Sequence, residues 1–355
     1  MKRIALLILA FTHVIGVCNA QTEVTAYQPG VTVEGITYFL PRTALRVTVV
    51  AERKVTTPGQ LAKYAFRYLR LNDVPTTATT VWTIKEVNLD AYGMPDPTKA
   101  YSIKLKNRTL APLASLTQDG ILLSINAEQA EQTLPTPPQG KPATPPADPR
   151  RYMSQEILTA GSTAKMAELC AREIYDIRES RNELIRGEAD NTPKDGQQLQ
   201  LMLNQLDTQS AALEQLFSGT TQTSTEVFTF TYVPTHEAER DVLFRFSQLA
   251  GVVDRDDLSG TPVYISIRPT NSLPPTTPNE ETNKKKGKLE QGIYYNVPAR
   301  EKVTVFDADH TFATTEVSMG QFGNVEILGE ALFDKKSTTR AFFHQTSGGL
   351  QRLEQ

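Results

Sequence analysis

A proline-rich segment near the middle of the chain constrains its fold more than any other feature. Seven of the 17 residues from Leu134 to Arg150 are proline. Proline has no backbone N–H, so such a run can continue neither a helix nor the interior of a sheet. It favours an extended and fairly stiff polyproline-type conformation. The sequence therefore predicts a linker at residues 131–151 that divides the chain into two parts.

The first part, residues 21–130, is predicted to be β-rich with one short helix. Leu45, Val47 and Val49 alternate with polar residues, which is the period of a half-buried strand. The segment "QLAKYAFRYLRL" then has apolar residues at helical spacing. We expect it to form a short amphipathic helix that packs on the sheet.

The second part begins with two stretches of helical periodicity, which together predict a helical hairpin at residues 152–220. Similar lengths and a short connection favour an antiparallel pair. Thr192 is predicted as the N-cap of the second helix, and Gly219 as its end. The apolar stripes consist of Met166, Leu169, Cys170, Ile174, Ile177, Leu184 and Ile185 in the first helix and Leu199, Met202, Leu203, Leu206, Leu213, Leu216 and Phe217 in the second.

Residues 221–355 return to strand patterns and are predicted to be a second β-rich region. A polar stretch at residues 272–291 is expected to be a mobile loop. The expected fold class is α+β, with β-rich regions flanking a long antiparallel helical hairpin. The two β-rich regions form either separate domains or two halves of one assembly.

Two short segments of these β-rich regions resemble each other. "GITYFLP" runs from Gly35 to Pro41 and "GIYYNVP" from Gly292 to Pro298, with four of seven positions identical. Proline ends each segment because it cannot donate to a strand ladder. Either the chain contains a duplication, or both segments are edge segments that turn into a long strand.

The first residues have the pattern of a signal peptide, expected at residues 1–20. Two basic residues precede an apolar run at residues 4–17, which is too short to span a bilayer comfortably. Small residues then favour cleavage between Ala20 and Gln21. In the alternative interpretation, Cys18 is the lipid-modified first residue of a lipoprotein.

Charge and cysteine content narrow the classes of function. Without residues 1–20 the chain has 35 basic and 40 acidic residues, so we expect no nucleic-acid partner, which would require a basic face. Cys170 is then the only cysteine, which excludes an internal disulfide. No later run of 18 apolar residues occurs, so no further transmembrane helix is expected.

Few residues point to catalytic chemistry. Asp307, Asp309 and His310 could hold a metal together, but Asp is also a common turn residue. Cys170 lies on an apolar stripe and is expected to be an inert, buried thiol. His236 lacks the second histidine of a zinc-protease helix, and no phosphate-binding loop or nucleophile elbow is present. We therefore expect no enzyme, no cofactor and no metal.

Three groups of residues could contact a partner. Arg172, Asp176, Arg178 and Glu179 on the first long helix could form a protein-docking face, or a solvated face joined by weak ion pairs. A basic run at residues 284–286 could touch a phosphate or acidic headgroup. Aromatic residues could stack on sugars, although strand aromatics more often fill a core. These aromatic residues are Tyr27, Tyr38, Trp82, Tyr294 and Tyr295.

Several segments also carry a resemblance to a known family. They are "YQPGVTVEGITYFLPRTALRVTV", "PGQLAKYAFRYLRL", "DGILLSIN", "AGSTAKMAELCAREIYDIRESRNELIRGEAD", "PKDGQQLQLMLNQLD" and "GIYYNVPAREKVTV" with "GQFGN". The chain resembles a family of exported proteins of Bacteroides-type bacteria that is catalogued as domain of unknown function 4831. The resemblance implies a cell-envelope context, without an activity or catalytic residues.

These observations predict an exported cell-envelope protein that binds or scaffolds another macromolecule and is not an enzyme. The alternatives are a glycan-binding module and a hydrolase without a familiar motif. We expect a location in the periplasm or at the outer-membrane periphery. The expected partner is another envelope protein or a glycan, with peripheral membrane association as a further option.

Overall fold

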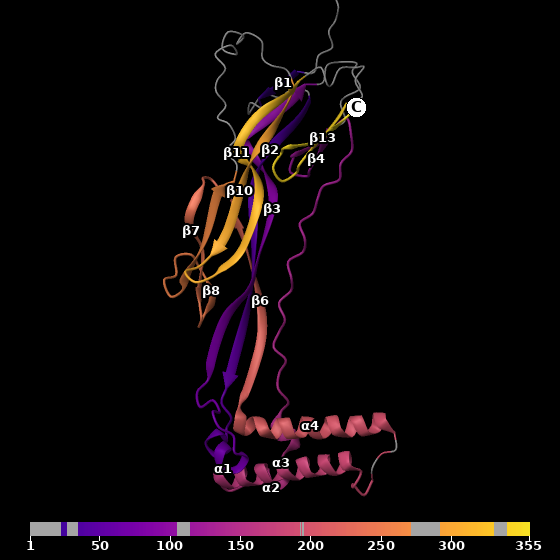
Figure 1. The fold of residues 1–355 in the computed structure, drawn as a ribbon, viewed down its shortest axis with the longest axis vertical. Coiled ribbons are helices and arrows are strands. Elements are labelled where there is room, and N and C mark those ends of the chain that lie inside the picture. Colours follow the sequence, from indigo (N-terminus) through magenta and orange to yellow (C-terminus); the bar gives the residue numbers. More distant parts are fainter. Residues whose placement is uncertain are drawn as a thin grey trace, which may run out of the picture.

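The computed structural model describes residues 23–26, 35–104, 114–191, 193, 195–270, 292–329 and 339–355. They form an elongated molecule with a body of β-sheets and a group of helices at one end (Figure 1). Strands account for 48% and helices for 23% of the described residues. No helix among them is long and apolar enough to cross a membrane. The predicted signal peptide and the predicted loop at residues 272–291 lie outside the described residues.

The first sheet has the strand order β1-β3-β2-β6, with antiparallel neighbours. Its strands are β1 (Glu23–Ala26), β2 (Gly35–Thr57), β3 (Thr79–Lys104) and β6 (Thr220–Tyr232). β2 and β3 form a hairpin of strands 23 and 26 residues long, on the order of 75 Å at the usual rise per residue. Leu45, Val47 and Val49 are all buried, as predicted, but Thr48 between them is 1% exposed, so this part of β2 is covered on both faces rather than half-buried.

The second sheet has the order β11-β10-β9-β7-β8, again antiparallel. Its strands are β7 (Ala238–Ser247), β8 (Gly251–Val253), β9 (Thr261–Pro269), β10 (Gly292–Phe306) and β11 (Thr311–Gly329). Val47 and Val49 of the first sheet share one apolar core with Val303 and Val305 of the second. The body of the molecule is therefore built as two sheets packed through their apolar faces.

The third sheet joins chain segments that are far apart in sequence. It has the order β13-β12-β5-β4, with the strands β4 (Ala114–Leu116), β5 (Leu122–Ile125), β12 (Arg340–Phe343) and β13 (Leu350–Glu354). Its core contains Tyr38 of β2, Ile293 of β10 and Phe343 of β12. Strands from both predicted β-rich regions thus share sheets and cores, so the two regions form one assembly.

The two similar segments of the sequence lie in contact with each other. Gly35 is the first residue of β2, and Gly292 is the first residue of β10. The Tyr38 hydroxyl accepts a hydrogen bond from the Tyr294 N–H at 2.9 Å and donates to the Tyr294 carbonyl at 3.3 Å. Each segment therefore opens a long strand, and the two openings are joined through one tyrosine.

The backbone around the two segments also repeats. Phe39 donates its N–H to Gly120 O at 2.9 Å, and Asn296, its counterpart in "GIYYNVP", donates to Gly348 O at 3.0 Å. Both glycines have a positive φ, 82° and 71°, which glycine adopts without steric cost. The long hairpin of β2 and β3 is followed in the chain by the short hairpin of β4 and β5. In the same way, the long hairpin of β10 and β11 is followed by the short hairpin of β12 and β13. This repeated geometry favours a duplicated unit over two unrelated edge segments.

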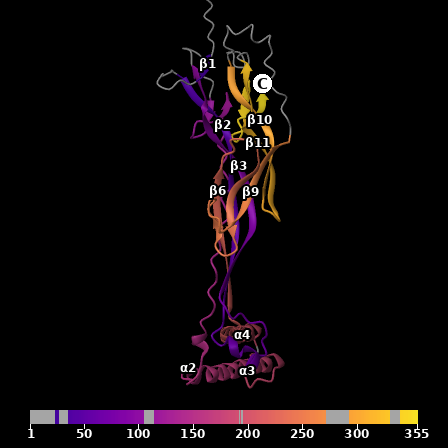
Figure 2. The ribbon, with the colours of Figure 1, turned by 90° about the vertical axis from the view of Figure 1, so that its left-hand side faces the viewer.

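A narrow stalk connects the body to the helices (Figures 1 and 2). It consists of the end of β2, the start of β3 and the start of β6, and no residue of β6 is fully buried. β6 has the sequence "TTQTSTEVFTFTY". Threonine has a high strand propensity and a side chain that water can solvate, so this ribbon can extend beyond the packed sheets.

Six helical elements of the described chain lie at the end beyond the stalk. They are η1 (Ala62–Tyr64, a 3-10 helix), α1 (Ala65–Leu69), η2 (Pro149–Tyr152, a 3-10 helix), α2 (Gln155–Leu158), α3 (Thr163–Arg186) and α4 (Gly196–Ser218). Gly219 caps the C-terminal end of α4, as predicted. The N-cap of α4 is Asp195, whose side chain accepts a hydrogen bond from the Gln197 N–H. The predicted cap, Thr192, lies outside the described residues.

The position of the short helix differs from the prediction. Leu61, Ala65 and Leu69 belong to the same apolar cluster as Ile174 of α3 and Phe217 of α4. The helix therefore packs on other helices and not on the sheet. The reason is that the nearby stalk has no wide apolar face, whereas α3 and α4 offer one.

The expected fold class, an α+β fold with β-rich regions flanking a long antiparallel helical hairpin, is wrong. The part of the chain that the structure describes is β-rich and forms three sheets. β2 pairs with β6 from Leu45 to Thr57, so the strands before and after the helices are neighbours in one sheet. Periodicity reports local structure only, and it gave no sign of this long-range pairing.

The proline-rich residues 131–148, here called the strap, run along the molecule from the third sheet to the helices without forming helix or strand (Figure 1). The Gln132 N–H donates to Gln345 Oε1 at 2.7 Å. The Lys141 carbonyl accepts from the Thr225 N–H at 2.8 Å, and its own N–H donates to Thr225 Oγ1 at 2.8 Å. The strap is thus extended, as proline content predicts, and attached to the body and the stalk.

Candidate functional site

The helices beyond the stalk, from η1 to α4, form what we call the helical platform. α3 and α4 extend across the long axis of the molecule, at the opposite end from β1 (Figure 1). Their buried faces meet in one apolar cluster that contains Ile174, Ile177, Leu213 and Phe217. The opposite faces of both helices carry polar and charged residues that are exposed. The platform therefore presents an exposed, largely polar surface at one end of an elongated support.

The structure places all four predicted docking residues on the exposed side of α3. Arg172 lies 3.8 Å from Glu168 in a weak ion pair, and its side chain is 62% exposed. Arg186 Nη2 lies 3.5 Å from Glu179, which is 65% exposed. Asp176 is also exposed. Three of these side chains are therefore open to a partner at little structural cost.

Arg178 has a second role. Its Nη2 lies 2.9 Å from Glu214 Oε1 of α4, and its guanidinium lies 5.5 Å from the centre of the Tyr175 ring. A similar bridge joins Arg181 to Asp207 at 2.6 Å. Exposed pairs of this kind contribute little stability, but they fix the relative position of the two helices. The Arg178 side chain is consequently less free to meet a partner than Arg172.

An apolar notch lies where the end of α3 meets the start of α4. It has a volume of about 400 Å³ and is lined by Leu184, Met202 and Leu206, with Glu183 and Gln205 among the polar residues around it. Ile185, predicted to lie on the buried stripe, is 55% exposed next to Leu184. The predicted burial of Ile185 is wrong because α3 extends past the packed core of the platform.

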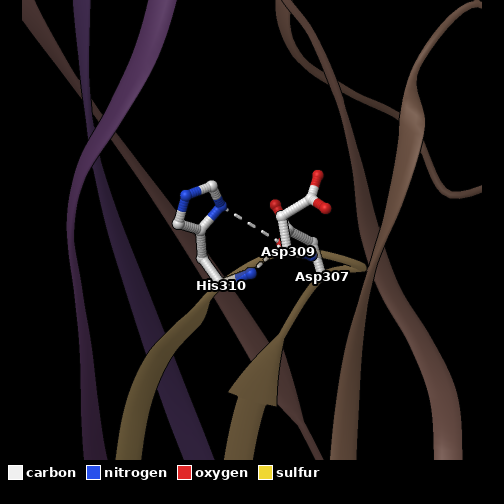
Figure 3. Close-up of side chains that lie close together, drawn as sticks. All are labelled: Asp307, Asp309 and His310. Carbon is white, nitrogen blue, oxygen red and sulfur yellow. Dashed lines mark hydrogen bonds and ion pairs between the residues drawn. The ribbon is translucent and has the colours of Figure 1, made fainter.

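Figure 3 shows Asp307, Asp309 and His310 in the turn between β10 and β11. Their ligand atoms lie within 4.8 Å of one another. Asp307 Oδ1, however, accepts from the Asp309 N–H at 2.8 Å and from the His310 N–H at 2.6 Å. These bonds are those of an Asp-stabilised turn. Turn formation is therefore sufficient to explain why the three side chains lie together.

Cys170 is fully buried in the platform core. Burial, with a smaller contribution from the charge of Glu173, raises the pKa of its thiol to about 11. The thiol is therefore protonated at neutral pH and is not a nucleophile, in agreement with the prediction. His236 is exposed on a loop, and its Nε2 lies 3.8 Å from Asp241.

The described aromatic residues that could have stacked on sugars make contacts within the protein, although Tyr295 is only half-buried. Tyr38 is fully buried, and burial raises the pKa of its hydroxyl well above the usual range. Tyr294 stacks on Tyr101 with ring centres 4.3 Å apart. The Trp82 ring lies against Gly251, and the Tyr295 hydroxyl donates to Glu326 at 3.0 Å. Tyr27 and the basic run at residues 284–286 lie outside the described residues.

Sequence reasoning missed a groove in the body, beside the loop between β12 and β13. It has a volume of about 700 Å³ and its lining includes Tyr295, Asn296, Arg300 and His344. Asn296 Nδ2 donates to Pro41 O at 2.9 Å and to Ser347 O at 2.8 Å, which holds the groove wall in place. The one available signal was the similarity of "GIYYNVP" to "GITYFLP", because it marks where the two long hairpins meet.

A buried carboxyl group is a second feature that the sequence did not reveal. Glu301 is 1% exposed, and neither of its carboxyl oxygens has a hydrogen-bond partner. Burial, together with the nearby charge of Glu237, raises its pKa above the ordinary value. Its neighbours in the ladders are Pro269 and Val317, which offer no compensating charge. Glu301 is therefore a buried carboxyl group on β10 without a compensating partner among the described residues.

Comparison with known proteins places the chain in a family. The model of the family described as "Domain of unknown function (DUF4831)" matches residues 34–351, nearly the whole chain. No curated protein and no solved structure matches. The match includes the body, the stalk, the strap and the platform. The chain therefore belongs to the family described as domain of unknown function DUF4831.

Proposed function

We propose that the protein is exported to the cell envelope and acts there as a binding or scaffolding protein rather than as an enzyme. The observation that carries this proposal is the shape of the molecule. A body of packed sheets extends through a stalk to a platform whose outer face carries exposed charges, among them Arg172, Asp176 and Glu179. This arrangement suits a protein that holds a docking surface away from its body.

Export is the first part of the proposal to test. N-terminal sequencing of the protein from cells that produce it should find Gln21 as the first residue. A chain that begins with an acylated Cys18 would show that the protein is a lipoprotein rather than a free exported protein. Retention of residues 1–20 in the cytoplasm would contradict the envelope location altogether.

Docking is tested by crosslinking in intact cells. Reversal of two exposed charges, Arg172→Glu with Asp176→Lys, should abolish recovery of the crosslinked envelope partner while thermal unfolding stays unchanged. The matched control reverses one exposed basic and one exposed acidic residue of the body, Lys302→Glu on β10 with Asp256→Lys between β8 and β9, and it should leave recovery intact. Equal recovery with both double variants would exclude this face of α3 as the docking surface.

A glycan-binding module is the second candidate, and it rests on the groove of about 700 Å³ in the body. Its lining offers the Tyr295 ring, the Arg300 guanidinium and the His344 imidazole, groups that commonly bind sugars. A glycan array should then show binding that His344→Ala and Arg300→Ala weaken. Absence of binding to envelope glycans would remove this candidate and leave the docking proposal untouched.

A further inference from the structure

The short helical segment from η1 to α1 has an unusual outer face. Lys63, Phe66, Arg67 and Arg70 are all exposed, and Phe66 is 58% exposed. No acidic residue occurs between Gly59 and Asn72. We call these four residues the basic–aromatic patch. The segment therefore carries three positive charges around one exposed apolar ring.

The patch is firmly held by the other face of the same segment. Leu61, Ala65 and Leu69, four residues apart, are buried in the platform core. The Tyr175 hydroxyl of α3 also donates to Tyr68 O at 2.9 Å. Tyr64 and Tyr68 pack partly against the same core, which leaves Lys63, Phe66, Arg67 and Arg70 on the outer face of the segment.

Each cation of the patch lies close to an aromatic ring. Lys63 Nζ lies 5.1 Å from the centre of the Tyr64 ring, the Arg67 guanidinium 5.3 Å from Tyr68, and the Arg70 guanidinium 5.6 Å from Phe66. Cation–π contacts leave the N–H donors of these groups available to an outside acceptor. The charges are thus positioned but not neutralised.

The basic residues of the patch differ from those of the neighbouring helix α3 in their ion pairing. Arg172, Arg178, Arg181 and Arg186 on α3 all have carboxylate partners. Among the described residues, none of Lys63, Arg67 and Arg70 has an acidic group within ion-pair distance. The charge of Arg67 contributes to the lowered pKa of Glu168, but the Glu168 carboxylate is paired with Lys165 at 2.9 Å.

We propose that the basic–aromatic patch binds the surface of a bilayer that contains anionic phospholipid. Lys63, Arg67 and Arg70 would contact lipid phosphates, and the Phe66 ring would enter at the level of the headgroups. Uncompensated basic residues around an exposed aromatic ring are the composition of interfacial membrane-binding segments. The patch lies at the opposite end of the molecule from β1 (Figure 1), so the long axis would stand away from the membrane surface.

This inference rests on the proposed function only because export would bring the patch to an envelope membrane. A lipid-binding test on purified protein needs no docking partner. Failure of lipid binding would therefore leave the docking proposal standing, and loss of the docking partner would leave lipid binding intact.

The test uses the chain from Gln21 onward, which keeps every described residue, and measures cosedimentation with vesicles. We expect binding to vesicles of phosphatidylcholine with phosphatidylglycerol, weakening as salt rises, and no binding to phosphatidylcholine alone. Lys63→Gln, Arg67→Gln and Arg70→Gln together should lower the affinity on the order of 100-fold, since each basic residue contributes about a factor of five at such a surface. Phe66→Ala should lower it by less.

A matched control removes three cations elsewhere. Lys54→Gln, Lys302→Gln and Arg340→Gln change exposed residues of the stalk and body, and this triple variant has the same net charge as the patch variant. It should bind vesicles like the unchanged chain, and circular dichroism should show the same helix content in all variants. Equal weakening in both triple variants would mean a general charge effect and overturn the patch. Binding to single-stranded DNA tighter than to the vesicles would also overturn it, in favour of a polyanion site.

Discussion

The sheet body and the helical platform are stabilised by contacts of different range. In the body, Val47 of β2 shares a core with Val305 of β10, more than 250 residues later in the chain. In the platform, most of the core comes from α3 and α4, which follow each other directly. The stalk between them has little buried surface. The difference teaches that the platform core and the core shared by the two large sheets are joined by a ribbon that cannot couple them strongly.

The largest expected effect tests whether the two cores unfold separately. Phe217→Ala removes a fully buried ring from the platform and should cost about 3 to 5 kcal/mol. Trp82, the single tryptophan, lies near the start of β3 where it contacts Gly251 of the body, so its fluorescence reports unfolding at that contact, whereas circular dichroism reports the helices. In urea, the helix signal of the variant should be lost first, with the fluorescence midpoint unchanged.

The matched substitution in the body is Val305→Ala, which should move the fluorescence transition and leave the helix transition in place. If either variant shifts both signals together, the two regions form one cooperative unit. The comparison between body and platform would then hold for architecture but not for stability.

The second effect concerns the junction of the two long hairpins. Asn296→Ala removes both donors that hold Pro41 O and Ser347 O. Leaving buried carbonyls without partners costs about 1 to 3 kcal/mol, so the fluorescence midpoint in urea should fall while the helix signal is unaffected. Exposed Asn204 on α4 is the control, and Asn204→Ala should change neither signal. An unchanged midpoint for Asn296→Ala would mean that water replaces the lost donors.

The third effect is a pH dependence confined to the body. Because the pKa of Glu301 is raised in the folded state, the folded protein binds this proton more tightly than the unfolded chain. Its contribution to stability is therefore present below the unfolded pKa and is lost as pH rises through the folded pKa. Glu301→Gln should reduce the loss of stability with rising pH. This loss is measured as the change in the urea midpoint of the fluorescence transition between pH 4 and 8. A variant with an unchanged pH profile would show that Glu301 is solvated.

The smallest effect concerns the bridge between the two platform helices. Arg181 Nε lies 2.6 Å from Asp207, and both side chains are substantially exposed. A double-mutant cycle of Arg181→Ala and Asp207→Ala should give a coupling of about 0.2 to 1 kcal/mol, which falls as salt is added. A larger coupling, insensitive to salt, would mean that the pair is shielded by a neighbouring surface.

Some parts of the fold could be predicted because their signals are local. The alternation around Val47 predicted a strand, the glycine at 219 predicted the end of α4, and the prolines predicted an extended segment. The start of α4 was misplaced because Asp195 is as good an N-cap as Thr192. The exposure of the docking residues on α3 followed from periodicity, but the bridge from Arg178 to Glu214 required knowledge of how α4 lies against it.

The sequence by itself determined the periods of the strands and helices, the extended strap, the unreactive environment of Cys170 and the membership of a family. Only the tertiary structure decided that β2 pairs with β6, that "GITYFLP" touches "GIYYNVP", and that α1 packs on helices and turns its cations outward. The physical reason is the range of the interactions. Backbone propensity and side-chain period act over a few residues, whereas strand pairing and burial depend on which distant surfaces meet.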